Sequence, residues 1–155
     1  MSKRRLIALL AGAAVFLSAG VMGFQNFQVP ELGLSEGKFK PLKSSPNGVS
    51  TQAQDPSKLV EILPFKEDTE TTMKAIKVVL DSYAGEYQVV AESSDYLRVV
   101  FITPGMRFRD DAEFWLDEKD RVVHFRSQSR VGHSDLGLNR ARYEELRHSY
   151  LELQM

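Results

Sequence analysis

Apolar residues along the chain change their spacing at Gly85. From Met73 to Tyr83 they recur every three or four positions, which predicts an amphipathic helix that begins at Thr69 or Thr71 and ends at Gly85. After Gly85 they recur at every second position, which is the spacing of strands with one buried face. The apolar positions of the four predicted strands are Tyr87, Val89 and Ala91; Leu97, Val99 and Phe101; Phe108, Ala112, Phe114 and Leu116; and Val123 and Phe125.

The connections between these strands are short. Ser93-Ser94-Asp95, Pro104-Gly105 and Glu118-Lys119 separate consecutive strands, which predicts a four-stranded antiparallel meander. A second helical pattern runs from about Leu138 to Leu153. We therefore expect an α+β fold in which the two helices pack on one face of the meander.

The hairpin between the third and fourth strands has a predicted register. A turn centred on Glu118-Lys119 pairs residues whose numbers add to 237, so Phe114 lies opposite Val123 and Ala112 lies opposite Phe125. A slip of one residue would exchange the two faces of both strands, so the apolar pattern constrains the register.

Asp110 falls on the apolar face of this hairpin, opposite Ser127. A buried carboxylate is costly unless it is paired, so we expect Ser127, Ser129 or an arginine of the following segment to bond to it. The other face carries charges that we expect to be open to water. Its predicted pairs are Glu113 with His124 and Asp111 with Arg126.

The first 24 residues have the pattern of a secretory signal or a membrane anchor. Lys3-Arg4-Arg5 precedes Leu6–Phe24, a run without any charge. Cleavage near the small residues Gly20 or Gly23 and retention as an inner-membrane anchor formed by residues 6–24 both fit this pattern. In either case the positive-inside bias predicts that the body of the chain is extracytoplasmic, in the periplasm.

Residues 25–58 are rich in proline and glycine and have no sustained period, so they are interpreted as an extended linker. Phe39, Leu42 and Val49 could equally hold this segment on the domain. Leu59 to Leu63, stopped by Pro64, is a further strand candidate without an identified partner. The predicted organisation is a leader over residues 1–24, a linker over 25–58 and a single domain over 59–155.

Composition excludes several classes of function. The chain has 155 residues, 43% of them hydrophobic, which is enough for one folded domain. Beyond the leader, 17 of the 20 basic residues remain against 21 acidic ones, and this net charge of −4 argues against binding of nucleic acid. The absence of cysteine excludes disulfides, thiolate metal sites and cysteine nucleophiles. No phosphate loop or dinucleotide fingerprint is present, so no cofactor is expected.

The stretch from Arg126 to Arg142 is the most unusual part of the sequence. Its arginines, serine hydroxyls and backbone amides near a helix start are suitable for holding an anionic small molecule. Alternatively, Asp110, Asp111 and Asp135 form salt bridges with these arginines and hold the last helix on the sheet. The candidate binding residues are Asp110, Arg126, Ser127, Ser129, Arg130, Ser134, Asp135, Asn139 and Arg140.

Three blocks carry a resemblance to a known family. They are Ser44 to Ala53 (SSPNGVSTQA), Arg107 to Phe114 (RFRDDAEF) and Arg126 to Arg142 (RSQSRVGHSDLGLNRAR). Together they resemble the bacterial and plastid family called domain of unknown function 1499. The resemblance implies no activity, and it implies a domain that often follows a signal or membrane segment. Where the family pattern often has cysteine after Ser-Pro-Asn, this chain has Gly48.

Enzyme chemistry is weakly supported by the sequence. His133-Ser134-Asp135 contains the residue types of a catalytic triad, but adjacent side chains in a loop cannot all converge. The three histidines lack the spacing of a typical metal site. We therefore expect a non-enzymatic binding or scaffolding module of the cell envelope, with an anion or an envelope protein as its partner. The alternative is a small hydrolase-like enzyme that uses Asp110 with Arg126 or Arg130.

Overall fold

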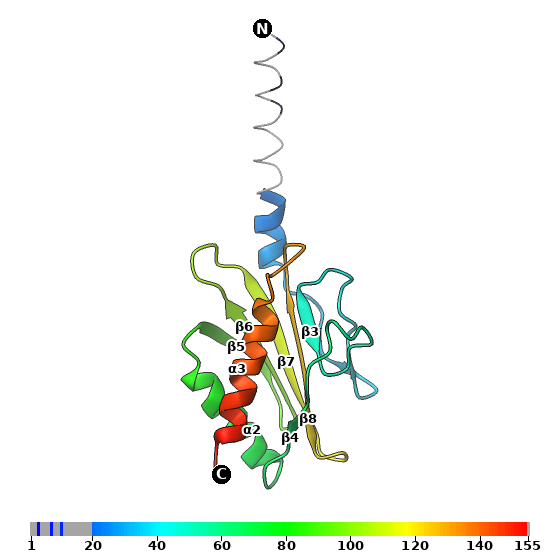
Figure 1. Cartoon of the computed structure of the whole chain (residues 1–155), viewed down its shortest axis with the longest axis vertical. Helices are drawn as coiled ribbons and strands as arrows, with labels where there is room; N and C mark the ends of the chain where they lie inside the picture. The colour runs from blue at the N-terminus through cyan, green and yellow to red at the C-terminus, as the bar shows by residue number, and fades with distance from the viewer. Residues whose placement is uncertain (1–2, 4–6, 8–9, 11–19, 155) are drawn as a thin grey trace.

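The computed structural model describes residues 20–154 and, within the leader, residues 3, 7 and 10. Most of the predicted signal or anchor segment therefore lies outside the described residues. Residues 20–27 form a helix that stands at one end of the domain (Figure 1). In the part of the chain that is described, no helix is both long and apolar enough to span a bilayer.

The predicted meander is present and forms the centre of an α+β fold. Four long strands follow one another in an antiparallel sheet: β5 (Glu86–Glu92), β6 (Tyr96–Ile102), β7 (Arg109–Asp117) and β8 (Val122–Ser129). Two short strands, β3 (Gly48–Ser50) and β4 (Leu63–Pro64), pair with the edge of β8 that faces away from β7. The complete sheet therefore has six strands in the order β3-β8-β7-β6-β5, with β4 also paired to β8.

The register of the β7–β8 hairpin differs from the predicted one by two residues. Phe114 lies opposite Phe125 and Glu113 lies opposite Arg126, so paired numbers add to 239. The cause is the turn, because the Asp117 carboxylate accepts hydrogen bonds from the amides of Lys119 and Asp120 and lengthens the loop to four residues. An error of two residues exchanges partners but keeps every side chain on its predicted face.

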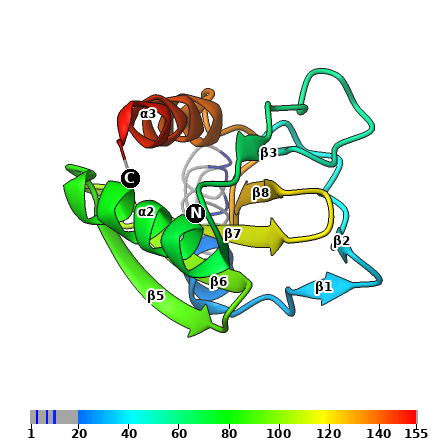
Figure 2. The ribbon, with the colours of Figure 1, turned by 90° about the horizontal axis from the view of Figure 1, so that it is seen from below.

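Both long helices cover the apolar face of the sheet, which we call the helix face (Figure 2). Helix α2 (Thr69–Ser82) begins where predicted, because the Asp68 carboxylate caps it by accepting a hydrogen bond from the Thr71 amide at 2.7 Å. Helix α3 (Leu138–Glu152) agrees with the predicted span to within one residue. The core between helices and sheet contains Met73, Ile76, Val79, Leu80, Leu97, Val99, Phe101, Ala112, Phe114, Leu116, Val123, Phe125, Tyr143, Leu146 and Tyr150.

The segment predicted as a linker packs against the sheet over much of its length. It contains a small hairpin of β1 (Leu34–Ser35) and β2 (Lys38–Phe39), followed by β3 on the sheet itself. Phe39 and Val49 are buried, as in the alternative in which they hold the segment on the domain. The backbone of Gly48 lies so close to β8 that an added Cβ would come within 2.8 Å of the Ser127 carbonyl oxygen.

The strand candidate at Leu59 to Leu63 is mostly irregular. Only its end, in β4, pairs with β8, where Leu63 lies opposite Val123. Leu59 forms an isolated parallel bridge with Ser50.

Candidate functional site

The structure divides the predicted site residues between the two faces of the sheet. Side chains alternate along a strand, so Asp110, Ser127 and Ser129 point toward the helices while Arg126 and Arg130 point away from them. We call the second side the polar face. Residues 25–43 of the N-terminal segment lie across it, and its charged side chains are buried rather than open to water.

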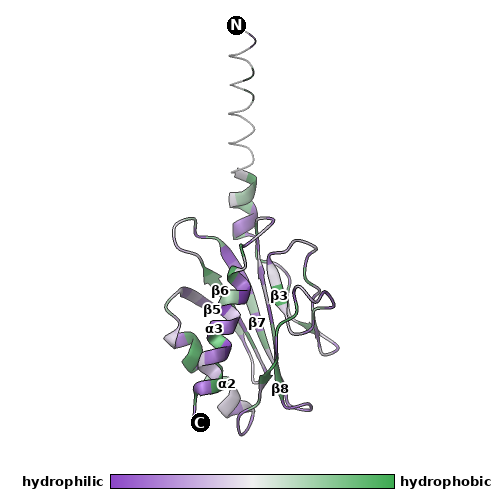
Figure 3. Ribbon diagram, viewed as in Figure 1, coloured by the Kyte–Doolittle hydropathy of each residue, from purple (hydrophilic) through white to green (hydrophobic). Residues whose placement is uncertain are grey.

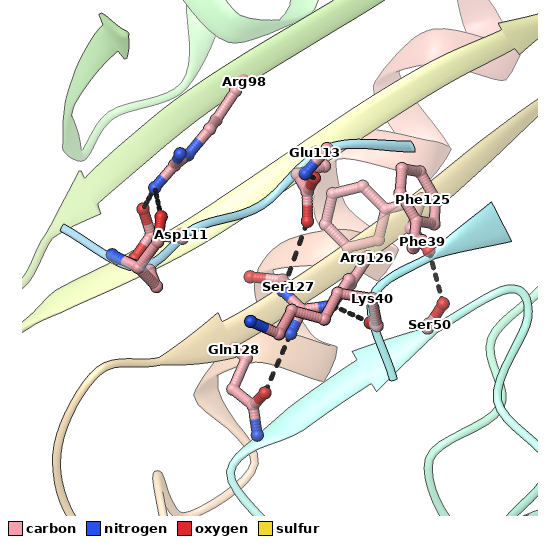
Figure 4. A network of polar contacts seen from close by, with 12 residues as sticks. Phe39, Lys40, Ser50, Arg98, Asp111, Glu113, Phe125, Arg126, Ser127 and Gln128 are labelled. Carbon is pink, nitrogen blue, oxygen red and sulfur yellow. Dashed lines mark hydrogen bonds and ion pairs between the residues drawn. The ribbon is translucent and has the colours of Figure 1, made fainter. Parts of the chain in front are cut away.

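Asp111 is the centre of the first charge cluster on the polar face. Its carboxylate accepts hydrogen bonds from Arg98 Nη2 at 2.6 Å and from Arg130 Nε and Nη2 at 2.7 and 3.1 Å (Figure 4 shows the Arg98 side). The residue is 1% exposed. The prediction that Asp111 faces water opposite Arg126 is therefore wrong, because the N-terminal segment covers it and the register brings Gln128 opposite it.

Both arginines also bond to the segment that covers them. Arg98 Nη2 donates to the carbonyl oxygen of Pro30, and Arg130 Nη1 donates to that of Asn26. The charge cluster thus joins β6, β7 and β8 to the chain that follows the leader.

Glu113 and Arg126 form the second cluster. Arg126 Nη1 lies 3.3 Å from Glu113 Oε2, while its Nε donates to the Lys40 carbonyl and its Nη2 to Gln128 (Figure 4). Burial raises the pKa of the Glu113 carboxyl above its ordinary value, against the opposing effects of the Tyr96 hydroxyl and of Arg126. Burial also lowers the pKa of Arg126. His124, the predicted partner of Glu113, instead stacks on Trp115.

The helix face carries a separate network with Asn139 at its centre. The Asn139 amide nitrogen donates to the Ser129 hydroxyl at 3.1 Å and to Asp135 at 2.8 Å, and its oxygen accepts from the Ser127 hydroxyl. Arg142 Nη1 also donates to this oxygen. Asn139 is 1% exposed, so these bonds fasten the start of α3 to β8.

Asp110 belongs to the Asn139 network on the helix face. It accepts a hydrogen bond from Arg142 Nη2 at 2.9 Å, which fulfils the expectation that an arginine of the following segment satisfies it. The guanidinium of Arg142 also lies over the Phe101 ring, 4.5 Å from its centroid. Because Asp110 and the pair Arg126 and Arg130 lie on opposite faces, the convergence required by the hydrolase alternative is not formed.

The remaining predicted residues hold loops in place. The Ser134 hydroxyl accepts from the Leu136 amide, and Asp135 accepts from the amides of Gly137 and Asn139. Arg140 donates to the carbonyl oxygens of Ser57 and Leu59 and belongs neither to the polar-face clusters nor to the Asn139 network.

A cleft of about 630 Å³ lies between the polar face and the segment that crosses it. Arg126, Gln128, Arg130 and Asp111 line it from the sheet. The crossing segment lines it with residues 28–32 and with Lys40, Pro41 and Lys43. We call this space the polar cleft. Its charged lining residues are four basic ones (Lys40, Lys43, Arg126 and Arg130) and two acidic ones (Glu31 and Asp111).

Sequence reasoning did not name Arg98, a member of the polar face. It placed Asp111 and Glu113 on this face but left both out of the candidate binding residues. A signal was available in the sequence, because each of three consecutive strands carries at least one charged residue on the same face. A strand face that is open to solvent shows the same pattern of charges. The pattern therefore does not reveal that the N-terminal segment covers this face. Within the described residues, no cluster of three or more histidine or acidic side chains is arranged to hold a metal ion.

Comparison with known families identifies the chain. A family model described as Protein of unknown function (DUF1499) matches residues 38–149. This span begins at β2 and includes the four long strands and most of α3. It therefore contains the charged side chains of the two polar-face clusters and the Asn139 network. Comparisons with curated proteins and with solved structures gave no match. The chain belongs to the DUF1499 family, as the sequence blocks around Asn47, Asp110 and Arg130 predicted.

Proposed function

We propose that this protein is a non-enzymatic, extracytoplasmic binding module of the cell envelope and that its polar cleft holds an anionic small molecule. The observation that carries the proposal is the charge of the cleft. Its lining has two more basic than acidic residues, whereas the chain beyond the leader has a net charge of −4. A concave site with this local excess attracts anions to one place on a molecule that otherwise repels them.

The arginines of the cleft retain hydrogen-bonding capacity after their internal pairing. A guanidinium has five N–H donors. Among the contacts of the described residues, Arg126 and Arg130 each donate one hydrogen bond from Nε, one from Nη1 and one from Nη2. Each Nη carries a second hydrogen, which is left to bond to a ligand. The acceptors Asp111 and Glu113 hold both planes in position, so an entering carboxylate or phosphate meets donors that are already oriented.

Lys40 and Lys43 supply the mobile part of the site. Both residues are exposed, and the Lys43 ammonium group lies 3.1 Å from the Arg130 carbonyl oxygen at the edge of the cleft. A flexible ammonium group at the edge of the cleft can turn toward a bound anion when it exchanges an exposed carbonyl contact for a charged partner.

The leader supports the proposed location. Its basic start and apolar run are typical of export, and we propose that it is retained as an anchor in the inner membrane. The candidate cleavage positions Gly20 and Gly23 lie in the helix of residues 20–27. That helix is attached to the domain through Asn26, which is 5% exposed and bonds to Arg107, Arg109 and Arg130.

Thermal unfolding of the full chain in a non-ionic detergent tests the binding proposal. Inorganic phosphate, citrate and glycerol phosphate are added in turn, because a ligand of the native state must raise the unfolding midpoint. We expect at least one anion to raise the midpoint and Lys43→Gln to reduce the rise. Lys74→Gln, a matched change at an exposed position of α2, should leave the rise unchanged. Equal responses of the two variants, or no response to any anion, would contradict the proposal.

A further inference from the structure

The most exposed large apolar side chains of residues 20–154 gather at one end of the molecule. Leu136 is 96% exposed and Met106 is 72% exposed, followed by Val29, Phe24 and Phe27. Phe24 and Phe27 belong to the helix of residues 20–27, which Figure 3 colours as partly hydrophobic. Met106 lies in the β6–β7 loop and Leu136 in the β8–α3 loop, and both loops reach this end in Figure 1. We call Phe24, Phe27, Met106 and Leu136 the apolar rim.

Direct contacts hold these three elements together. The Asn26 side chain donates to the Arg107 carbonyl at 2.9 Å and accepts from the Arg109 amide at 2.8 Å, which joins the helix to the β6–β7 loop. A second cleft of about 280 Å³ has Met22, Phe108 and Leu136 among its lining residues, so the β8–α3 loop closes the same end. The four residues of the apolar rim therefore lie on three elements that are joined at this end of the molecule.

The fold gives no reason for a leucine at position 136. Its φ of +55° is in the left-handed region, which glycine and asparagine tolerate better than a branched apolar residue. The Ser134 hydroxyl and the Asp135 carboxylate hold this loop by bonds to the amides of Leu136 and Gly137. Leu136 is one of four exposed apolar residues at this end, and an apolar patch of this kind is typical of a contact with something outside the chain.

Phe27 adds a feature suited to a lipid interface. The guanidinium of Arg109 lies 4.2 Å from the centroid of its ring, yet the residue is still 67% exposed. An aromatic ring beside a cation places apolar surface and positive charge at the same level, as residues do where a membrane protein meets the headgroup region.

We propose that the apolar rim docks on the outer surface of the lipid bilayer in which the leader is anchored. The sequence of Leu6–Phe24 leads directly into the helix of residues 20–27, so an anchor in the membrane brings this end of the domain to the bilayer. This inference rests on the proposed anchoring, and it adds a fixed orientation in which the C-terminal end of α3 points away from the membrane.

Site-specific fluorescence in membranes tests the orientation. The natural chain has no cysteine, so a single introduced cysteine carries one environment-sensitive label. The full chain is reconstituted into phosphatidylcholine and phosphatidylglycerol vesicles with the label at Leu136→Cys or Met106→Cys. Leu151→Cys, an exposed leucine near the other end of α3, is the matched control, and Leu10→Cys reports on the leader.

We expect emission from positions 136 and 106 to shift to shorter wavelength and to be quenched by lipids that carry a shallow spin label, while position 151 remains in water. If position 136 resembles position 151, the docking is wrong. A shift at position 136 without quenching by the labelled lipid would mean that a protein covers the rim, which also overturns the proposal. The label at position 10 separates the two failures, because its exclusion from lipid contradicts the anchoring itself. Both rim positions are largely exposed, so circular dichroism should show unchanged folding.

Discussion

Substitution of Asp111 by alanine removes the centre of the buried charge cluster. The change eliminates three hydrogen bonds, of 2.6, 2.7 and 3.1 Å, to two guanidinium groups whose side chains are 10% and 7% exposed. Among the contacts of residues 20–154, Arg98 and Arg130 then keep the backbone carbonyls of Pro30 and Asn26 as their acceptors. Both arginines would therefore lose their direct ion pair while their side chains stay largely buried.

The expected cost follows from the loss of one partner. Each hydrogen bond to a charged group contributes about 1.5–3 kcal/mol, but relaxation and entry of water recover part of the sum. Breaking a buried ion pair from one side costs about 3–5 kcal/mol. We expect a loss of this size in the free energy of unfolding, which is a large part of the roughly 5–15 kcal/mol available to a domain.

Urea denaturation of the full chain, followed by circular dichroism, measures this loss. Asp111→Ala should lower the midpoint at an unchanged slope. The control is Glu86→Ala, because the ion pair between Glu86 and Arg107 is 42% and 55% exposed and should contribute little. Replacing the whole cluster by Arg98→Met, Asp111→Leu and Arg130→Met should recover most of the stability. A loss below about 1 kcal/mol for Asp111→Ala would refute the reasoning, since solvated pairs are worth that little.

Three further substitutions test other parts of the structure. Asp110→Ala should cost about 3–5 kcal/mol in urea denaturation, because it breaks the buried ion pair with Arg142 from one side. Gly48→Ala should cost about 1–3 kcal/mol in the same assay, because the new Cβ would meet the Ser127 carbonyl; an unchanged midpoint would show that β3 can move away. Burial lowers the pKa of His124 in the folded state below its ordinary 6.5, so folding favours the neutral imidazole. This stabilisation is fully present above pH 6.5 and is lost as the pH falls through the lowered pKa of the folded state. Fluorescence of Trp115, the single tryptophan, should report this titration below pH 6.5 through its stacking on His124, and His124→Gln should abolish it.

The faces of the strands could be predicted from the sequence because alternation depends only on the strand period. Asp110 was correctly placed on the apolar side, and its partner Arg142 fits one of the alternatives expected for it, which were Ser127, Ser129 or an arginine. The partners across the β7–β8 hairpin could not be predicted, because they depend on whether the Asp117 side chain bonds to the turn. That choice is made by a single carboxylate and leaves no trace in the hydrophobic pattern.

The polar cleft could not be found because its cover has no periodic signal. Residues 25–43 cover this face with backbone groups that any sequence supplies: the Pro30 carbonyl accepts a hydrogen bond from Arg98, and the Gly33 amide donates one to Glu113. The interpretation of Arg126 to Arg142 as one site failed for a related reason. The block continues from β8 into α3, and its side chains divide between a network that fastens α3 and a network that lines the cleft.

An NMR titration of the full chain with inorganic phosphate tests the central claim most directly. Backbone amides are followed while phosphate is added at constant ionic strength. If the polar cleft is an anion site, the signals of residues 126–132, 28–32 and 40–43 shift together and saturate, and Lys43→Gln weakens the binding. Saturating shifts confined to residues 134–139 at the start of α3, or no saturating shift anywhere, would contradict the assignment of the cleft as the binding site.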